Sequence, residues 1–269
     1  MSLHHYTPRG NRRRGVSNAA RKILGTVLTI AILLQVYCPF AHGKVLNLVT
    51  ILAIYTGALA MILHAIYSFG WRYALTYLGV TLLFASIVEK IGVKTGWPFG
   101  EHTFDSSLGV KIYGVPVVIP FVWVMLTHPI LVAARRVTKN WTFIYGGAVV
   151  MAWHLFLDPQ FATSHRVKWT FTGAHVPSEK ELPMSNPVGW LFTGMLLIAV
   201  LHVILPKERR KYGAEFAIVD IFLAWTLLAG LADYLFFFHR PATAMFAGLI
   251  YSIILAPYFF SRWLGQPGE

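Results

Sequence analysis

Charged residues are scarce in this chain of 269 residues: they make up 13% of the sequence, whereas hydrophobic residues make up 56%. A soluble domain carries about a quarter charged residues, so the composition excludes an ordinary water-soluble fold. The few charges lie in short stretches between long apolar runs. The chain is therefore predicted to be embedded in a lipid bilayer.

Cysteine is almost absent, and histidine forms no cluster. The single cysteine, Cys38, excludes an internal disulfide, a Cys-rich zinc site and an iron–sulfur cluster held by this chain alone. The histidines of the apolar region stand singly, and the only adjacent pair, His4 and His5, lies in the N-terminal tail. Membrane di-iron oxygenases require clustered histidines, so this class of enzyme is disfavoured.

Cofactor motifs are missing as well. No G-x-G-x-x-G stands between a strand and a helix, which argues against a bound dinucleotide, and no pair of Asp-rich motifs indicates binding of magnesium diphosphate. We therefore expect no cofactor and no metal ion. Any reaction is expected to use the side chains of the protein alone.

Apolar stretches of about 20 residues, the length that crosses a bilayer, divide the chain. They are predicted at 23–42, 45–69, 72–91, 115–134, 141–158, 187–205, 216–238 and 242–264. The predicted fold class is all-α, a polytopic membrane helix bundle with about eight transmembrane helices. We expect a basic cytoplasmic tail at 1–22, a single membrane-embedded domain at 23–264 and a short C-terminal tail at 265–269.

Basic residues outnumber acidic ones and give a formal net charge of +12. They lie between the apolar runs and form no separate basic domain, so nucleic acid is not an expected partner. In a multi-pass protein of the cell membrane with both termini in the cytoplasm, most of them would face the cytoplasm, as the positive-inside rule requires. Those inner residues are Arg9, Arg12, Arg13, Arg14, Arg21, Lys22, Arg72, Arg135, Arg136, Lys139, Lys207, Arg209, Arg210, Lys211 and Arg262.

Acidic side chains gather near the outer ends of the predicted spans. Glu89, Asp158 and Asp233 share one depth there, and two long outer connections, at 92–114 and 159–186, are candidate functional loops. Ionisable groups in a membrane usually face the bundle interior and have a partner or a function. The alternative for each is an interfacial charge that pairs with a nearby Lys or Arg.

His154 and Asp158 are four residues apart and so share one face of a helix. The imidazole could hydrogen-bond the carboxyl group and set its proton affinity, as proton-transfer chemistry requires. The alternative is a satisfied core histidine beside an Asp that ends its helix before Pro159.

Four groups of motifs in the outer segments resemble one known family. The first comprises residues 89–92, T-G-W-P-F-G at 95–100, L-G at 108–109, G-V-P at 114–116, and I-P at 119–120 with Trp123. The second comprises A-W at 152–153 and L-F-L-D-P-Q at 155–160, the third L-P-M-S-N at 182–186 with G-W at 189–190, and the fourth H-R-P at 239–241. Over most of residues 72–260 the chain resembles the integral-membrane carotenoid biosynthesis family, which includes carotenoid hydratases. It departs from the family pattern at His154, where an acidic residue is usual, and at His102 and Phe104, where aromatic residues, often tyrosines, are usual.

The activity that the resemblance implies is cofactor-free hydration of the acyclic terminal double bond of a carotenoid to a tertiary alcohol, started by an acid. Such an acid must be neutral before it donates its proton, a state that burial near hydrocarbon favours. Asp158 is the first candidate, Glu89 and Asp233 are the next, and His154 is the partner of Asp158. The alternatives are a carotenoid end-group cyclase or isomerase, and a non-catalytic membrane protein that binds carotenoid or lipid.

The expected partners are a carotenoid or other polyisoprenoid lipid and the bilayer itself, with other enzymes of carotenoid synthesis as further candidates. The residues expected to bind the substrate are Trp97, Phe99, Glu101, Trp153, Asn186, Trp190 and Tyr234. Aromatic faces among them could stabilise a cation, although Trp and Tyr also anchor membrane proteins at the interface.

The predicted topology can be tested by cysteine labelling. Single cysteines introduced at Ser106 and Ser178 should react with an impermeant reagent added from outside the cell, because both long connections are expected to face outward. Labelling of both positions only from the cytoplasm would contradict an outer site.

Overall fold

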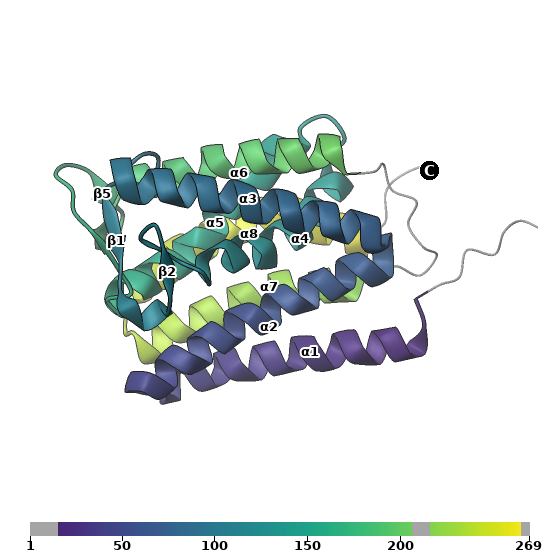
Figure 1. Cartoon of the computed structure of the whole chain (residues 1–269), viewed down its shortest axis with the longest axis horizontal. Coiled ribbons are helices and arrows are strands. Elements are labelled where there is room, and N and C mark those ends of the chain that lie inside the picture. The colour runs from purple at the N-terminus through teal and green to yellow at the C-terminus, as the bar shows by residue number, and fades with distance from the viewer. Residues whose placement is uncertain (1–15, 206–215, 265–269) are drawn as a thin grey trace, which may run out of the picture.

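The computed structural model describes residues 16–205 and 216–264, and within them the chain forms eight α-helices. These are α1 (Asn18–Tyr37), α2 (Gly43–Phe69), α3 (Trp71–Thr95), α4 (Ile119–Val137), α5 (Thr142–Thr163), α6 (Ser185–Ile204), α7 (Phe216–Ala232) and α8 (Pro241–Trp263). A 3₁₀ turn, η1 (Cys38–Phe40), links α1 to α2, and a π-helical turn, η3 (Asp233–Phe237), follows α7. The predicted all-α bundle is confirmed (Figure 1).

Six of the eight helices are long and apolar enough to cross a membrane, by length and composition: α1, α2, α3, α6, α7 and α8. The other two, α4 and α5, match predicted spans but carry polar residues such as His128 and Arg135 in α4, and His154 and Asp158 in α5. Both are central, since almost every residue of α4 from Ile119 to Ala134 is buried. Their polar residues pack against protein inside the bundle, which explains why their composition differs from that of the helices at its periphery.

The two long connections that were predicted to face outward are more ordered than simple loops. The first contains β1 (His102–Phe104), η2 (Ser106–Leu108), β2 (Lys111–Ile112) and β3 (Val115–Pro116), and the second contains β4 (Val167–Trp169), β5 (His175–Val176) and β6 (Glu179–Pro183). β1 pairs with β4 in antiparallel register, with His102 opposite Trp169 and Phe104 opposite Val167. The hairpins β2–β3 and β5–β6 lie at the same end of the bundle (Figure 1). The two connections therefore form one cover over that end.

The opposite end of the bundle holds the described part of the predicted cytoplasmic charge. Arg72 follows the start of α3, Arg135 and Arg136 end α4, Lys139 precedes α5, and Arg262 ends α8. The residues at 1–15, 206–215 and 265–269, including eight of the predicted inner basic residues, lie outside the described ranges. Helix α1 begins at Asn18, within the range 1–22 predicted for the basic tail, and the boundary between tail and membrane domain stays a prediction. Which face of the bundle is cytoplasmic stays a prediction.

Helices α5 and α6 pack closely because glycines face each other across their contact. A Cβ atom at Gly147 would lie 2.3 Å from Cγ of Met195, and one at Gly194 would lie 2.8 Å from Cβ of Val150. Small residues let helix backbones approach in membranes, where packing replaces the hydrophobic effect as the force between helices.

Replacement of Gly147 should therefore destabilise the bundle. We expect Gly147→Ala to cost about 1–3 kcal/mol through overpacking against Met195 and the α6 backbone. The measurement is thermal unfolding of the purified protein in detergent. Gly79→Ala is the matched control, because a Cβ at Gly79 meets no atom within 4 Å. Equal melting temperatures for the two variants would show that the α5–α6 contact does not limit stability.

Candidate active site

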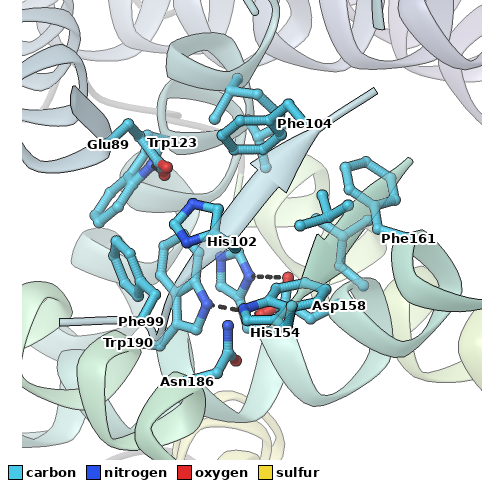
Figure 2. Close-up of a pocket in the computed structure, with 15 residues that line it drawn as sticks. Glu89, Phe99, His102, Phe104, Trp123, His154, Asp158, Phe161, Asn186 and Trp190 are labelled. Carbon is cyan, nitrogen blue, oxygen red and sulfur yellow. Dashed lines mark hydrogen bonds and ion pairs between the residues drawn. The ribbon is translucent and has the colours of Figure 1, made fainter. Parts of the chain in front are cut away.

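A small pocket lies beneath the cover formed by β1 and β4, between α3, α4, α5 and α6. We call it the Asp158 pocket; it has about 30 Å³ of free space, enough for one or two water molecules. Its lining consists of Glu89, Phe99, His102, Phe104, Ile119, Val122, Trp123, His154, Leu157, Asp158, Phe161, Val167, Trp169, Asn186 and Trp190. Figure 2 shows the polar members, Glu89, His102, His154, Asp158 and Asn186, among aromatic rings.

The carboxyl group of Asp158 is held by two nitrogen atoms. His154 Nδ1 lies 3.1 Å from Oδ1, one helical turn away on α5, and Trp190 Nε1 on α6 donates to Oδ2 at 2.7 Å. The His154 ring stacks on the Trp190 ring with their centroids 3.2 Å apart and their planes 9° apart. The predicted His154–Asp158 contact is therefore present, and stacking on Trp190 fixes the orientation of the imidazole. His154 Nε2 is buried and has no hydrogen-bond partner among the described residues.

Glu89 enters the pocket from α3. Its side chain is buried, at 2% exposure, and Oε1 accepts a hydrogen bond of 2.8 Å from Trp123 Nε1 on α4. Among the described residues no basic side chain forms an ion pair with Glu89, and Oε2 has no hydrogen bond to protein. In Figure 2, Glu89 and Asp158 lie on either side of His102. Two carboxyl groups thus reach the same pocket without a Lys or Arg partner.

Aromatic rings connect the two carboxyl groups. The Trp190 centroid lies 4.7 Å from that of Trp123 and 4.5 Å from that of Phe99. Because Trp123 donates to Glu89 and Trp190 donates to Asp158, the N–H groups of both indoles are occupied by carboxyl oxygens. Their π faces form a wall of the pocket, the kind of surface that attracts a cation.

His102 is brought to the pocket by the pairing of β1 with β4. Its Nδ1 lies 2.8 Å from the carbonyl oxygen of Gly100, and its ring lies 6.0 Å from that of Trp169. Gly92 on α3 leaves space for it, since a Cβ there would lie 3.1 Å from His102 Cε1. Burial lowers the pKa of His102 below its ordinary value of 6.5, because the charged imidazolium loses hydration, so the ring is neutral at pH 7.

Six of the predicted site residues meet in the pocket: Glu89, Phe99, His154, Asp158, Asn186 and Trp190. The others lie elsewhere. Asp233 and Trp153 line a second cavity, and Tyr234 is buried with its hydroxyl on the carbonyl of Phe156. Trp97 is 67% exposed, and Glu101 is exposed on the cover.

Nine of the fifteen pocket residues were not among the predicted site residues, and three of these nine carry ring nitrogens: His102, Trp123 and Trp169. Trp123 could have been selected from the sequence, because it belongs to the first group of family motifs together with Glu89, whose carboxyl group it contacts. Trp169 had no signal, because it reaches the pocket through pairing between two connections that are far apart in the chain.

A profile of the carotenoid biosynthesis protein family matches residues 48–254, a range that includes every residue of the pocket. The chain belongs to this family. It is also similar to a bisanhydrobacterioruberin hydratase of Haloarcula japonica, with 27% identity over 158 residues, 55% of this chain and 52% of the relative. The chain thus matches about half the length of that relative. No solved structure matches the chain.

The family and the fold together describe a membrane protein of carotenoid biosynthesis, as the motifs predicted. The matched range contains α3 to α7 in full and most of α2 and α8, and of the described helices only α1 lies wholly before residue 48. The pocket is therefore part of the portion of the chain that carries the family signal.

The lowered pKa of His102 predicts a pH dependence of stability. At pH values between the pKa of His102 in the folded protein and 6.5, this residue is protonated in the unfolded chain and neutral in the folded protein. Stability therefore falls as the pH drops below about 6.5. His102→Gln should reduce the loss of melting temperature between pH 7.5 and pH 5.5. His239→Gln, an exposed histidine in the connection before α8, is the control. The idea fails if His102→Gln has the same pH dependence as the wild type.

Proposed function

We propose that the protein hydrates the acyclic terminal double bond of a carotenoid to a tertiary alcohol, using acid–base chemistry in the Asp158 pocket. Family membership and the similarity to a hydratase support the substrate class and the reaction. The observation that carries the proposal is a small, aromatic-lined pocket that Glu89 and the Asp158–His154 pair both reach.

Glu89 is suited to donate the first proton. Oε1 accepts from Trp123 Nε1, and among the described residues Oε2 has no hydrogen bond to protein and can carry a proton. A general acid must reach the substrate carbon directly, and the pocket lining places Glu89 at its surface. Transfer of this proton to the less substituted carbon of the alkene breaks its π bond and leaves a tertiary cation on the other carbon.

The cation would form beside the aromatic wall. Trp123, Trp190 and Phe99 offer π faces whose quadrupoles attract positive charge, and Asp158 adds a carboxylate. This stabilisation requires no metal ion, because the charge that develops is on carbon and the π faces are already in place.

Water would then be activated by His154. Asp158 orients Nδ1 of His154, which leaves Nε2 as the atom that can accept a proton, and Nε2 has no hydrogen-bond partner in the described part of the chain. The water oxygen bonds to the tertiary carbon and gives one proton to His154 Nε2. That proton must return to Glu89 before the next turnover, so the net change is addition of one water to the substrate.

This division of roles differs from the order that the sequence suggested, in which Asp158 was the first candidate acid. Both oxygens of Asp158 are paired with nitrogen atoms, at 3.1 Å and 2.7 Å, an arrangement that suits a carboxylate and leaves little room for a carried proton. Glu89 has one oxygen in such a contact. We therefore assign the acid role to Glu89 and the positioning role to Asp158.

A cyclase would share the acid step but would capture the cation with an internal alkene, and it would exclude water from the site. The unpartnered Nε2 of His154 and the free space for one or two waters favour hydration. A non-catalytic carotenoid binder would not require two buried carboxyl groups in one pocket.

The test is expression in cells that make an acyclic carotenoid, with chromatography and mass spectrometry of the pigments for a gain of 18 mass units per hydrated end, the mass of one water. Glu89→Gln keeps the side-chain volume but cannot donate a proton, so hydration should fall at least ~10²-fold, the usual loss of a general acid. Asp158→Asn and His154→Gln should also lower product at least ~10²-fold. Asp233→Asn changes a carboxyl group outside the pocket and is the control, so it should lose less hydration activity than the three pocket variants.

Expression level and thermal stability of each variant show whether the fold is intact. Near-normal turnover by Glu89→Gln would exclude Glu89 as the acid. If Asp233→Asn were the variant without activity, the reaction would belong to the second cavity. A product isomeric with the substrate, without gain of water, would support a cyclase or isomerase.

A further inference from the structure

A second cavity lies beside the Asp158 pocket and is much larger. It has about 520 Å³ of free space, and most of its lining comes from α1, α2, α5 and α7. Leu157 and Phe161 line both hollows, so these two side chains separate them. A hollow of this volume accommodates a whole ligand and not only water.

The lining of the second cavity is polar at the covered end of the bundle and mostly apolar below it. Ser164 and Arg166 directly follow α5 at the covered end. Trp153 and Phe222 line the cavity about ten residues before the ends of α5 and α7, a depth of ~15 Å at the rise of an α-helix. The indole N–H of Trp153 donates to Thr226 Oγ1 at 3.2 Å, so it needs no partner in the cavity. The hollow is therefore elongated, with a polar end and an apolar end.

The second cavity reaches the apolar outer surface of the bundle. Three of its lining residues, Val36, Phe40 and Phe237, are 45%, 60% and 41% exposed. The rings of Phe40 and Phe237 meet edge to face with their centroids 5.3 Å apart, between η1 and η3. Because the exposed side chains at this rim are apolar, we expect the rim to face lipid, so that a ligand enters sideways from the bilayer.

Arg166 is the charged group of the polar end whose hydrogen bonds are least satisfied. It is buried, at 6% exposure, and its Nη2 donates to Thr50 Oγ1 at 3.2 Å. A guanidinium has five N–H donors, and among the described residues this is the one hydrogen bond that the Arg166 side chain makes. Its Nε is buried and has no partner there. Thr50 is neutral, so it leaves the positive charge uncompensated.

No carboxylate lies within ion-pair distance of Arg166 in residues 16–205 and 216–264. Asp105 is joined to Arg166 through the backbone, but its carboxylate accepts from the Ser107 N–H at 2.7 Å. Asp233 also lines the cavity, and its Oδ2 accepts from Gln160 Nε2 at 3.3 Å. A buried guanidinium without an anion is costly, so a ligand that brings an anionic oxygen to Arg166 would offset that cost.

The shape and polarity of the cavity restrict what this anion can be. A small inorganic anion would leave the apolar end of the cavity empty, whereas a pure hydrocarbon would leave Arg166 without a counter-ion. A single apolar chain with an anionic head matches both ends. The head must be compact, because Arg166 is buried beside β4, and a carboxylate is compact and offers two oxygens to the planar guanidinium.

We propose that the second cavity binds a fatty acid, with its carboxylate on Arg166 and its chain running toward Trp153 and Phe222. This site is separate from the Asp158 pocket, and its ligand carries a charge that a carotenoid hydrocarbon lacks. The proposal does not depend on hydration in the neighbouring pocket.

The experiment compares dibrominated stearic acid with its methyl ester, each added to the purified full-length protein in detergent at a pH well above the pKa of the carboxyl group. Bromine quenches nearby tryptophan fluorescence, and Trp153 and Trp225 line the cavity. The two probes have the same chain, so quenching of tryptophans on the outer surface is common to both. We expect the acid to bind at least about tenfold more tightly than the ester, the size of one hydrogen bond to a charged group.

Arg166→Gln should abolish the preference for the acid and leave the affinity for the ester unchanged, which also shows that the cavity is intact. Lys168→Gln is the matched control, because it removes a positive charge two residues away, at an exposed position of β4 outside the cavity lining. It should keep the preference. Asp233→Asn removes a negative group from the cavity wall, so it should keep or increase the preference.

Equal affinity of the unaltered protein for the acid and the ester would overturn the proposal, and this comparison holds even if Arg166→Gln does not fold. A preference that survives in Arg166→Gln, or that is lost in Lys168→Gln, would also overturn it. Competition by acetate as strong as by unlabelled stearate would show a site for small anions and not for a chain. Tighter binding of a long-chain amine than of the acid would make Asp233 the determinant and exclude the proposed role of Arg166.

Discussion

The contact between α5 and α6 is the packing on which the Asp158 pocket depends. Gly147 and Gly194 bring the two backbones close, and this places Trp190 of α6 against His154 and Asp158 of α5. A wider separation would remove the indole N–H from Asp158 and the stacking surface from His154. The same close approach would be prevented by any larger side chain at these glycines, so the chemistry of the pocket is tied to helix packing outside it.

Carboxyl groups within the described part of the bundle fall into two kinds. The buried Glu179 is paired with Arg240 Nη1 at 2.7 Å and with the Thr243 hydroxyl, and the partly buried Asp220 is paired with Arg262 Nη2 at 2.7 Å. These pairs compensate their charges locally and join a cover strand to α8 and α7 to α8. They are structural contacts.

Glu89 and Asp158 are of the other kind. Each is buried, at 2% and 5% exposure, and each accepts a hydrogen bond from an indole N–H. Among the described residues neither is paired with a Lys or Arg, and Asp158 also contacts His154. An indole N–H satisfies one carboxyl oxygen without supplying positive charge, so the carboxyl group can be either protonated or ionised. This contrast, and not burial alone, distinguishes the proposed reactive carboxyl groups from the structural ones.

Much of the fold was predictable from local sequence. Apolar runs and the spacing of Lys and Arg located all eight helices, because a membrane span must be long and apolar wherever it lies in the chain. The central position of α4 and α5 was not predicted, because the polar residues of a helix do not by themselves show which neighbouring helices surround it. The i,i+4 relation of His154 and Asp158 was also predictable, because one helix contains both residues.

What the sequence alone determined, therefore, was the helical membrane fold, the family motifs and the contacts within single helices. The tertiary structure decided which of the carboxyl groups at one depth share a pocket: Glu89 joins Asp158, whereas Asp233 lines the second cavity. It also brought His102 and Trp169 together, through strands 67 residues apart in the β1–β4 register. Depth in a membrane follows from position along one helix, but rotation of that helix toward a particular neighbour follows from side-chain packing between helices, which no local pattern specifies.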